Sequence, residues 1–149
     1  MKVAVLTGRR RIEIREVPDP HLGKESDALL RVEAVGVCGS DVHYYSEGRI
    51  GNQIVEYPFM VGHECAGIVE KVGRAVTRLK PGDRIAVDPA VVCGACDQCL
   101  VGRANTCRNL LFLGTPGQSS GCMCEYIVMP EQNCHPAQPG NDSGRGSAC

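Results

Sequence analysis

The first half of the chain alternates apolar and polar residues over short stretches. Residues 3–7 alternate in character, Gly8 turns the chain, and residues 12–16 alternate on the way back. A period of two is typical of half-buried strands, so the first seventeen residues are predicted to form a β-hairpin. Pro18-Asp-Pro20 then ends its second strand.

Similar apolar stretches recur at close intervals along the rest of the chain. Gly and Pro punctuate them, as in the tight turn predicted at Pro81-Gly-Asp83. Gly39-Ser40-Asp41 is typical of a helix start and predicts a short helix over residues 40–47. Many short strands with little helical periodicity favour a mainly β fold, a partly open β-barrel. The further strands are expected at residues 28–37, 65–72, 84–87 and 125–129.

Composition excludes several classes of function. The 149 residues include 16 basic and 17 acidic side chains, which leaves no electrostatic basis for binding nucleic acid or an anionic membrane surface. The short Arg9-Arg10-Arg11 run fits a solvated turn. No apolar run approaches the roughly 20 residues of a membrane span. The apolar run at the N-terminus is too short for a secretory signal. Ten cysteines without such a signal indicate metal binding in a reducing, cytoplasmic setting.

Four of these cysteines lie within fifteen positions, at Cys93, Cys96, Cys99 and Cys107. Incidental cysteines or a disulfide are one interpretation, and an iron–sulfur cluster is another. Ferredoxin-type runs place the fourth cysteine three residues after the third and follow it with proline, whereas the gap here is longer and Arg108 follows. The spacing therefore favours a closed, structural zinc site of four thiolates in a loop lobe.

Another set of possible ligands, Cys38 and His63-Glu64, lies upstream. A lone histidine is more often a surface or core residue than a ligand, but the surrounding residues change that interpretation. The segment Gly62-His-Glu-Cys-Ala-Gly-Ile-Val-Glu-Lys-Val-Gly73 resembles the signature of zinc-containing medium-chain alcohol dehydrogenases, and Cys38-Gly-Ser-Asp-Val-His-Tyr44 follows the same family. The stretch from Cys38 to Gly67 is most similar to the sorbitol (polyol) dehydrogenase branch.

The resemblance covers residues 1–135, the GroES-like catalytic domain of that family, and it implies a second, catalytic zinc ion. Cys38 and His63 would be its ligands, and Glu64 would be either a third ligand or a carboxylate that exchanges onto the metal. Asp41 would orient the His63 ring, because metal-bound histidines usually hydrogen-bond a carboxylate.

The resemblance also implies roles around the substrate. Ser40 and His43 would pass the proton of the substrate hydroxyl toward solvent, since a hydroxyl and an imidazole both donate and accept. Tyr44 and Phe112 would line the substrate pocket, or would be ordinary core aromatics. The substrate would be a polyol or another secondary alcohol, with hydride transfer to NAD(P), in a family whose members are homo-oligomers.

The family's Rossmann domain has no counterpart in this sequence, because no G-x-G-x-x-G follows a strand. Residues 136–149 contain almost nothing apolar and are predicted to be a disordered or aberrant tail, as a frameshift or premature stop would produce. No residue is assigned to cofactor binding, and activity of this chain alone is not expected. A non-catalytic zinc-binding module is the alternative, whereas a zinc-free quinone-reductase relative would leave both ligand sets without a purpose.

Overall fold

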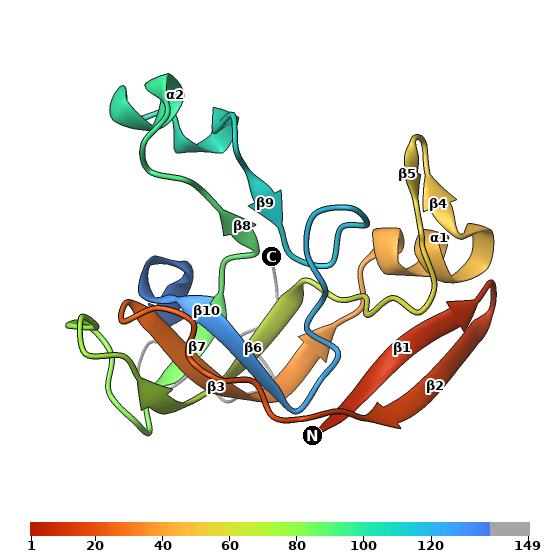
Figure 1. The fold of residues 1–149 in the computed structure, drawn as a ribbon, viewed down its shortest axis with the longest axis horizontal. Coiled ribbons are helices and arrows are strands. Elements are labelled where there is room, and N and C mark those ends of the chain that lie inside the picture. Colours follow the sequence, from red (N-terminus) through yellow and green to blue (C-terminus); the bar gives the residue numbers. More distant parts are fainter. Residues whose placement is uncertain (138–149) are drawn as a thin grey trace.

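A five-stranded antiparallel sheet forms the centre of the computed structural model, which describes residues 1–137 (Figure 1). Within these residues the two edge strands do not pair with each other, so the sheet curves without closing. This confirms the prediction of a mainly β, partly open barrel. In spatial order the strands are β10 (Tyr126–Pro130), β3 (Asp27–Gly36), β6 (Glu64–Val72), β7 (Arg84–Val87) and β11 (Cys134–Pro136).

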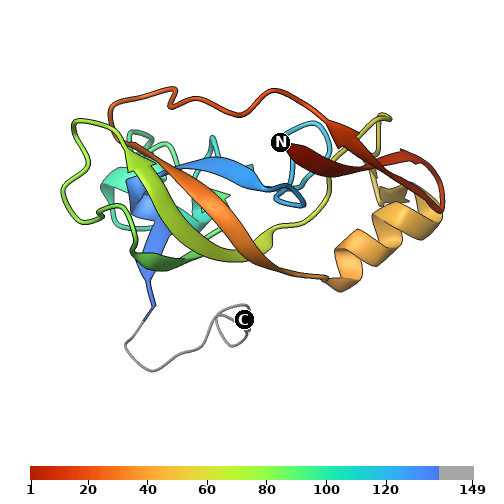
Figure 2. The ribbon, with the colours of Figure 1, turned by 90° about the horizontal axis from the view of Figure 1, so that it is seen from below.

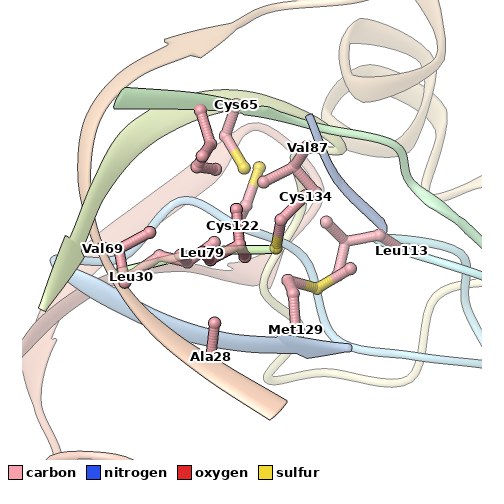
Figure 3. Close-up of a cluster of buried hydrophobic side chains, with 11 residues drawn as sticks. Ala28, Leu30, Cys65, Val69, Leu79, Val87, Leu113, Cys122, Met129 and Cys134 are labelled. Atoms are coloured by element: carbon pink, nitrogen blue, oxygen red, sulfur yellow. The ribbon is translucent and has the colours of Figure 1, made fainter. Parts of the chain in front are cut away.

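The hydrophobic core lies against one face of this sheet. Strands β3 and β6 supply Ala28, Leu30 and Val69, each at most 1% exposed. Three cysteines pack among them, as Figure 3 shows for Cys65, Cys122 and Cys134. Burial raises the pKa of Cys134 to about 12, so its thiol stays neutral and acts as a small apolar side chain. Part of the high cysteine content therefore serves packing rather than metal binding.

The predicted N-terminal hairpin is present as β1 (Lys2–Gly8) and β2 (Arg11–Glu16). Arg10 lies in the turn with a φ of 59°. The other edge of β1 touches the chain at isolated bridges, among them Leu6 with Phe59. Leu6 is fully buried and belongs to a second apolar cluster. The hairpin is thereby fixed to the segment that leads into β6.

Helix α1 (Gly39–Glu47) follows β3 directly, where Gly39-Ser40-Asp41 predicted a helix. It packs beside a small hairpin of β4 (Arg49–Ile50) and β5 (Gln53–Ile54), as Figures 1 and 2 show. The four buried members of the second apolar cluster join this unit to β1: Leu6, Tyr44, Val55 and Val61.

The cysteine lobe projects away from the sheet between two short paired strands, β8 (Ala90–Val91) and β9 (Leu111–Phe112) (Figure 1). We expected a loop here, but the lobe contains one turn of helix, α2 (Asp97–Leu100), and the 3₁₀ turn η1 (Ala104–Thr106). A second 3₁₀ turn, η2 (Glu131–Asn133), connects β10 to β11.

The predicted domain limit at residue 135 lies inside β11, and the Ala137 N–H still donates to the Arg84 carbonyl oxygen, 2.8 Å away. Most of the predicted tail, residues 138–149, lies outside the described residues. Across residues 1–137 no helix has the length and apolar character needed to cross a membrane.

Candidate metal centres

The sulfur atoms of the lobe converge on one point. The Sγ–Sγ distances are 3.5 Å for Cys96–Cys99, 3.9 Å for Cys96–Cys107 and 3.5 Å for Cys93–Cys107. A tetrahedron with four Zn–S bonds of about 2.3 Å has an edge of about 3.8 Å. All four sulfurs, those of Cys93, Cys96, Cys99 and Cys107, lie within 4.8 Å of one another, so the donor set fits a closed zinc site.

Backbone and side-chain N–H groups point at two of these sulfurs. The N–H of Ala95 and the side-chain amide of Asn109 lower the pKa of Cys93 to about 6. The N–H of Arg108 lowers the pKa of Cys96, whereas desolvation raises that of Cys99 to about 12. Donors aimed at a sulfur stabilise its thiolate, which is the form that binds a metal. The loop backbone is therefore arranged for a cluster of negative charge that a divalent cation would neutralise.

An exposed ion pair links two segments of the lobe. The Arg108 guanidinium donates to both carboxylate oxygens of Asp97, at 2.5 and 2.8 Å. This pair holds the pKa of Asp97 at about 2. Because Asp97 begins α2 and Arg108 follows Cys107, the contact ties the helical turn to the end of the cysteine run.

A second donor group forms where β3, α1 and β6 meet. Cys38 lies between β3 and α1, His63 lies just before β6, and Glu64 is the first residue of that strand. Their ligand atoms all lie within 4.8 Å of one another. A thiolate, an imidazole and a carboxylate are the ligand types of catalytic zinc sites, which keep a position open for water or substrate.

Asp41 hydrogen-bonds the backbone at or next to two residues of this second group. It is 3% exposed, and its two carboxylate oxygens accept hydrogen bonds from the backbone N–H groups of Cys38 and Gly62, each at 2.9 Å. Its Oδ1 also lies 3.7 Å from Nδ1 of His63, while Nε2 on the other side of the ring lies 3.9 Å from Glu64. The ring therefore presents Nε2 to the group and Nδ1 to the carboxylate.

Two glycines make this geometry possible. Gly62 has a φ of +96°, which an L side chain adopts only with strain, and a Cβ there would lie 3.0 Å from Met123. Gly36 pairs with Glu64 across β3 and β6, and a Cβ at Gly36 would overlap the Glu64 carboxylate. The absence of a side chain at residue 36 thus leaves space for the carboxylate at the donor group.

The second donor group borders a cavity of about 720 Å³, here called the main cavity. The sequence-predicted residues Ser40, Tyr44 and Phe112 all line it together with His63. The Phe112 ring lies 5.5 Å from the His63 ring, centroid to centroid. His43 is exposed on α1 and does not line the main cavity.

The sequence analysis missed three polar residues in the wall of this cavity: Gln53, Thr115 and Gln118. Gln53 accepts a hydrogen bond from the Tyr44 hydroxyl at 2.7 Å, and Gln118 accepts one from the backbone N–H of Phe112 at 2.8 Å. No local pattern marks them, because they reach the cavity through the small hairpin and through the loop after β9. Cys107 and Arg108 of the lobe also contribute to the wall.

A curved β domain with one four-sulfur group and one mixed donor group beside a cavity is typical of the two-site zinc domains of dehydrogenases. Residues 24–139 match the alcohol dehydrogenase GroES-like domain, and the chain belongs to that family. Enzymes of this family depend on zinc and on NAD(P).

Similar proteins point to one branch of the family. Sorbitol dehydrogenase of Bacillus subtilis is 49% identical over 129 residues, which cover 87% of this chain and 36% of the relative. D-xylulose reductase A of Aspergillus niger is 42% identical over 131 residues, 88% of this chain and 36% of the relative. In the crystal structure of galactitol-1-phosphate dehydrogenase from Escherichia coli, 41% of the chain superimposes on 99% of this one, with 28% identity and a TM-score of 0.88. The chain thus spans about a third of the length of its curated relatives.

Proposed function

We propose that this chain supplies the zinc-binding catalytic domain of a dehydrogenase that oxidises a polyol or another secondary alcohol with NAD(P). One observation carries the proposal: the donor atoms of Cys38, His63 and Glu64 converge within 4.8 Å beside the main cavity. The names of the relatives, a sorbitol dehydrogenase and a D-xylulose reductase, support the substrate class.

Each residue of the second donor group has a separate task in this proposal. Zinc held there supplies a Lewis acid that lowers the pKa of the substrate hydroxyl, and NAD(P) supplies the hydride acceptor. Cys38 contributes a negative thiolate and His63 its Nε2 atom. Glu64 is the third ligand, or a carboxylate that moves on and off the metal. Asp41 fixes the backbone on both sides of this pair.

The hydroxyl proton needs a route out of the main cavity. Ser40 lines the cavity from the first turn of α1, and His43 lies three residues further along the same helix, where it is exposed. Residues three apart lie on the same side of a helix, so in this proposal Ser40 would take the proton in the cavity and His43 would release it to solvent. Tyr44 and Phe112 line the same cavity and would bound the substrate pocket.

The four-cysteine lobe has a structural task. Few apolar residues hold it closed, and Leu100 and Val101 at its tip are 75% and 67% exposed. A metal bound by four thiolates would supply the folding free energy that packing does not, since structural zinc sites typically stabilise by about 10–16 kcal/mol.

Cadmium substitution followed by ¹¹³Cd NMR tests the proposal directly. We expect two resonances, of which Cys99→Ser removes one and Cys38→Ser removes the other. Adding sorbitol should move only the resonance that depends on Cys38. Two resonances that both ignore sorbitol and 2-butanol would instead support the alternative, a zinc-binding module without catalysis.

A further inference from the structure

Two glutamines in the wall of the main cavity are held in the same unusual way. The side-chain oxygen of each is occupied by a protein donor, through the Tyr44 hydroxyl for Gln53 and the Phe112 backbone N–H for Gln118. Within residues 1–137 neither Nε2 atom hydrogen-bonds to protein. A primary amide has one acceptor oxygen and two N–H donors, so each glutamine has only donors left for a ligand.

The orientation of Gln118 follows from chemistry alone. A backbone N–H can only donate, so the atom 2.8 Å from Phe112 N is the amide oxygen, and Nε2 lies on the other branch. Tyr44 is 3% exposed and desolvation raises its pKa, so its hydroxyl stays protonated. This hydroxyl donates to the Gln53 Oε1 atom at 2.7 Å. Both side chains are exposed, and each is oriented by one hydrogen bond that takes its amide oxygen.

The charges around the main cavity narrow the ligand further. No carboxylate belongs to the described wall of the main cavity, and its one cation, Arg108, is already paired with Asp97. Ser40, Tyr44 and Thr115 add hydroxyl groups to the same wall. A ligand with several uncharged acceptor oxygens complements the donors of this wall.

We propose that Gln53 and Gln118 are substrate-specificity residues, whose amide N–H groups donate to hydroxyls of a neutral polyol other than the one that reacts. This inference rests on the proposed function of the site. It adds that discrimination between a polyol and a simple alcohol depends on the amide N–H groups of Gln53 and Gln118. Contacts with Tyr44 and with Phe112 of β9 orient these amides, and neither glutamine lies on a segment that carries a metal ligand.

Glutamate substitutions test the inference while preserving the contacts that hold the loops. In Gln53→Glu and Gln118→Glu a carboxylate oxygen still accepts from Tyr44 or Phe112, but the group facing the cavity becomes an acceptor. Binding of sorbitol and of 2-butanol to the cadmium-loaded chain is followed through the Cys38-dependent resonance. Each variant should lower the ratio of sorbitol to 2-butanol affinity about fivefold, the effect of one neutral hydrogen bond. The new negative charge changes the metal in the same way for both alcohols, so its effect cancels in the ratio of the two affinities.

A matched variant and a direct probe complete the experiment. Gln132→Glu makes the same change on η2, where the amide donates to the Val92 carbonyl oxygen outside the main cavity, and it should leave the ratio unchanged. In ¹⁵N-labelled protein, sorbitol should shift the side-chain amide signals of Gln53 and Gln118, and 2-butanol should not. Wild-type ratios in both glutamate variants would overturn the inference and leave the proposed function standing. A resonance that responds to neither alcohol would overturn both.

Discussion

Asp41 and Gly62 are joined by a buried hydrogen bond of 2.9 Å, from the glycine N–H to the aspartate Oδ1. The other carboxylate oxygen of Asp41 accepts from the N–H of Cys38. One buried side chain thus fixes the backbone beside both Cys38 and His63, which are 25 positions apart in the chain. The sequence analysis expected Asp41 to act on the His63 ring, but its direct hydrogen bonds are to backbone.

Replacing Asp41 by asparagine should therefore weaken both the fold and the second metal group. Asparagine offers one acceptor oxygen for two N–H donors and places an N–H against the second of them. We expect a loss of about 2 kcal/mol in the free energy of unfolding, typical of hydrogen bonds to a charged group. Urea denaturation measures this loss, and competition with a chelator should show weaker metal binding at Cys38 and His63 while the lobe retains its metal. Equal weakening at both sites would contradict a local role.

Gly36→Ala should displace the Glu64 carboxylate without unfolding the domain. The new methyl group would occupy the position of that carboxylate, and the flexible glutamate side chain can rotate away. We expect metal affinity at the Cys38 group to fall about tenfold, a loss typical of a perturbed metal environment. Gly39→Ala is the control, because a Cβ there meets nothing within 4 Å. If both variants bind zinc alike, the space at residue 36 has no function.

Removing one ligand from each group should separate the two metal sites. The wild-type chain should contain two zinc ions by elemental analysis, and Cys38→Ser and Cys99→Ser should each contain one. Only Cys99→Ser should expose residues 93–107 to proteolysis, because the lobe depends on its metal for folding. A wild-type chain with one zinc would eliminate one of the two sites.

Stability in mild acid should depend on Glu131. The backbone N–H of Arg78, and also that of Thr77, donate to this carboxylate and hold its pKa below the usual 4.5. A carboxylate with a lower pKa in the folded state stabilises the fold above its unfolded pKa, and this contribution disappears as the pH falls below about 4.5. Glu131→Gln should therefore flatten the decline of the melting temperature below that pH, whereas Glu16→Gln on exposed β2 should not. Parallel declines in wild type and Glu131→Gln would refute the prediction. Metal release is common to these variants and cancels in the comparison.

The sequence predicted those parts of the fold in which short-range pattern determines structure. Alternation identified β1 and β2 within a residue or two, a mostly apolar run did the same for β6, and the cysteine spacing identified the lobe. The pattern missed β11, since three residues that include Pro136 have no period, and their pairing with β7 depends on chain far away. The same holds for the two-residue strands β4, β5, β8 and β9.

The candidate site divides in a similar way. Cys38 and His63 were identified through motifs that surround them in the chain. Gly36 was not, because its role depends on Glu64, 28 positions later. Gln53 and Gln118 were missed for a comparable reason. Each can offer N–H donors to a ligand because another residue, Tyr44 or Phe112, already hydrogen-bonds the amide oxygen.

Cys107 belongs at once to the sulfur cluster of the lobe and to the wall of the main cavity, and Arg108 beside it shares that wall. The shape of the main cavity is therefore expected to depend on whether a metal ion occupies the lobe. Thermodynamic linkage makes this dependence mutual. An alcohol that binds better when the lobe holds its metal raises the metal affinity of the lobe by the same factor. Removing zinc from the lobe alone would then weaken alcohol binding even while the Cys38 group keeps its metal.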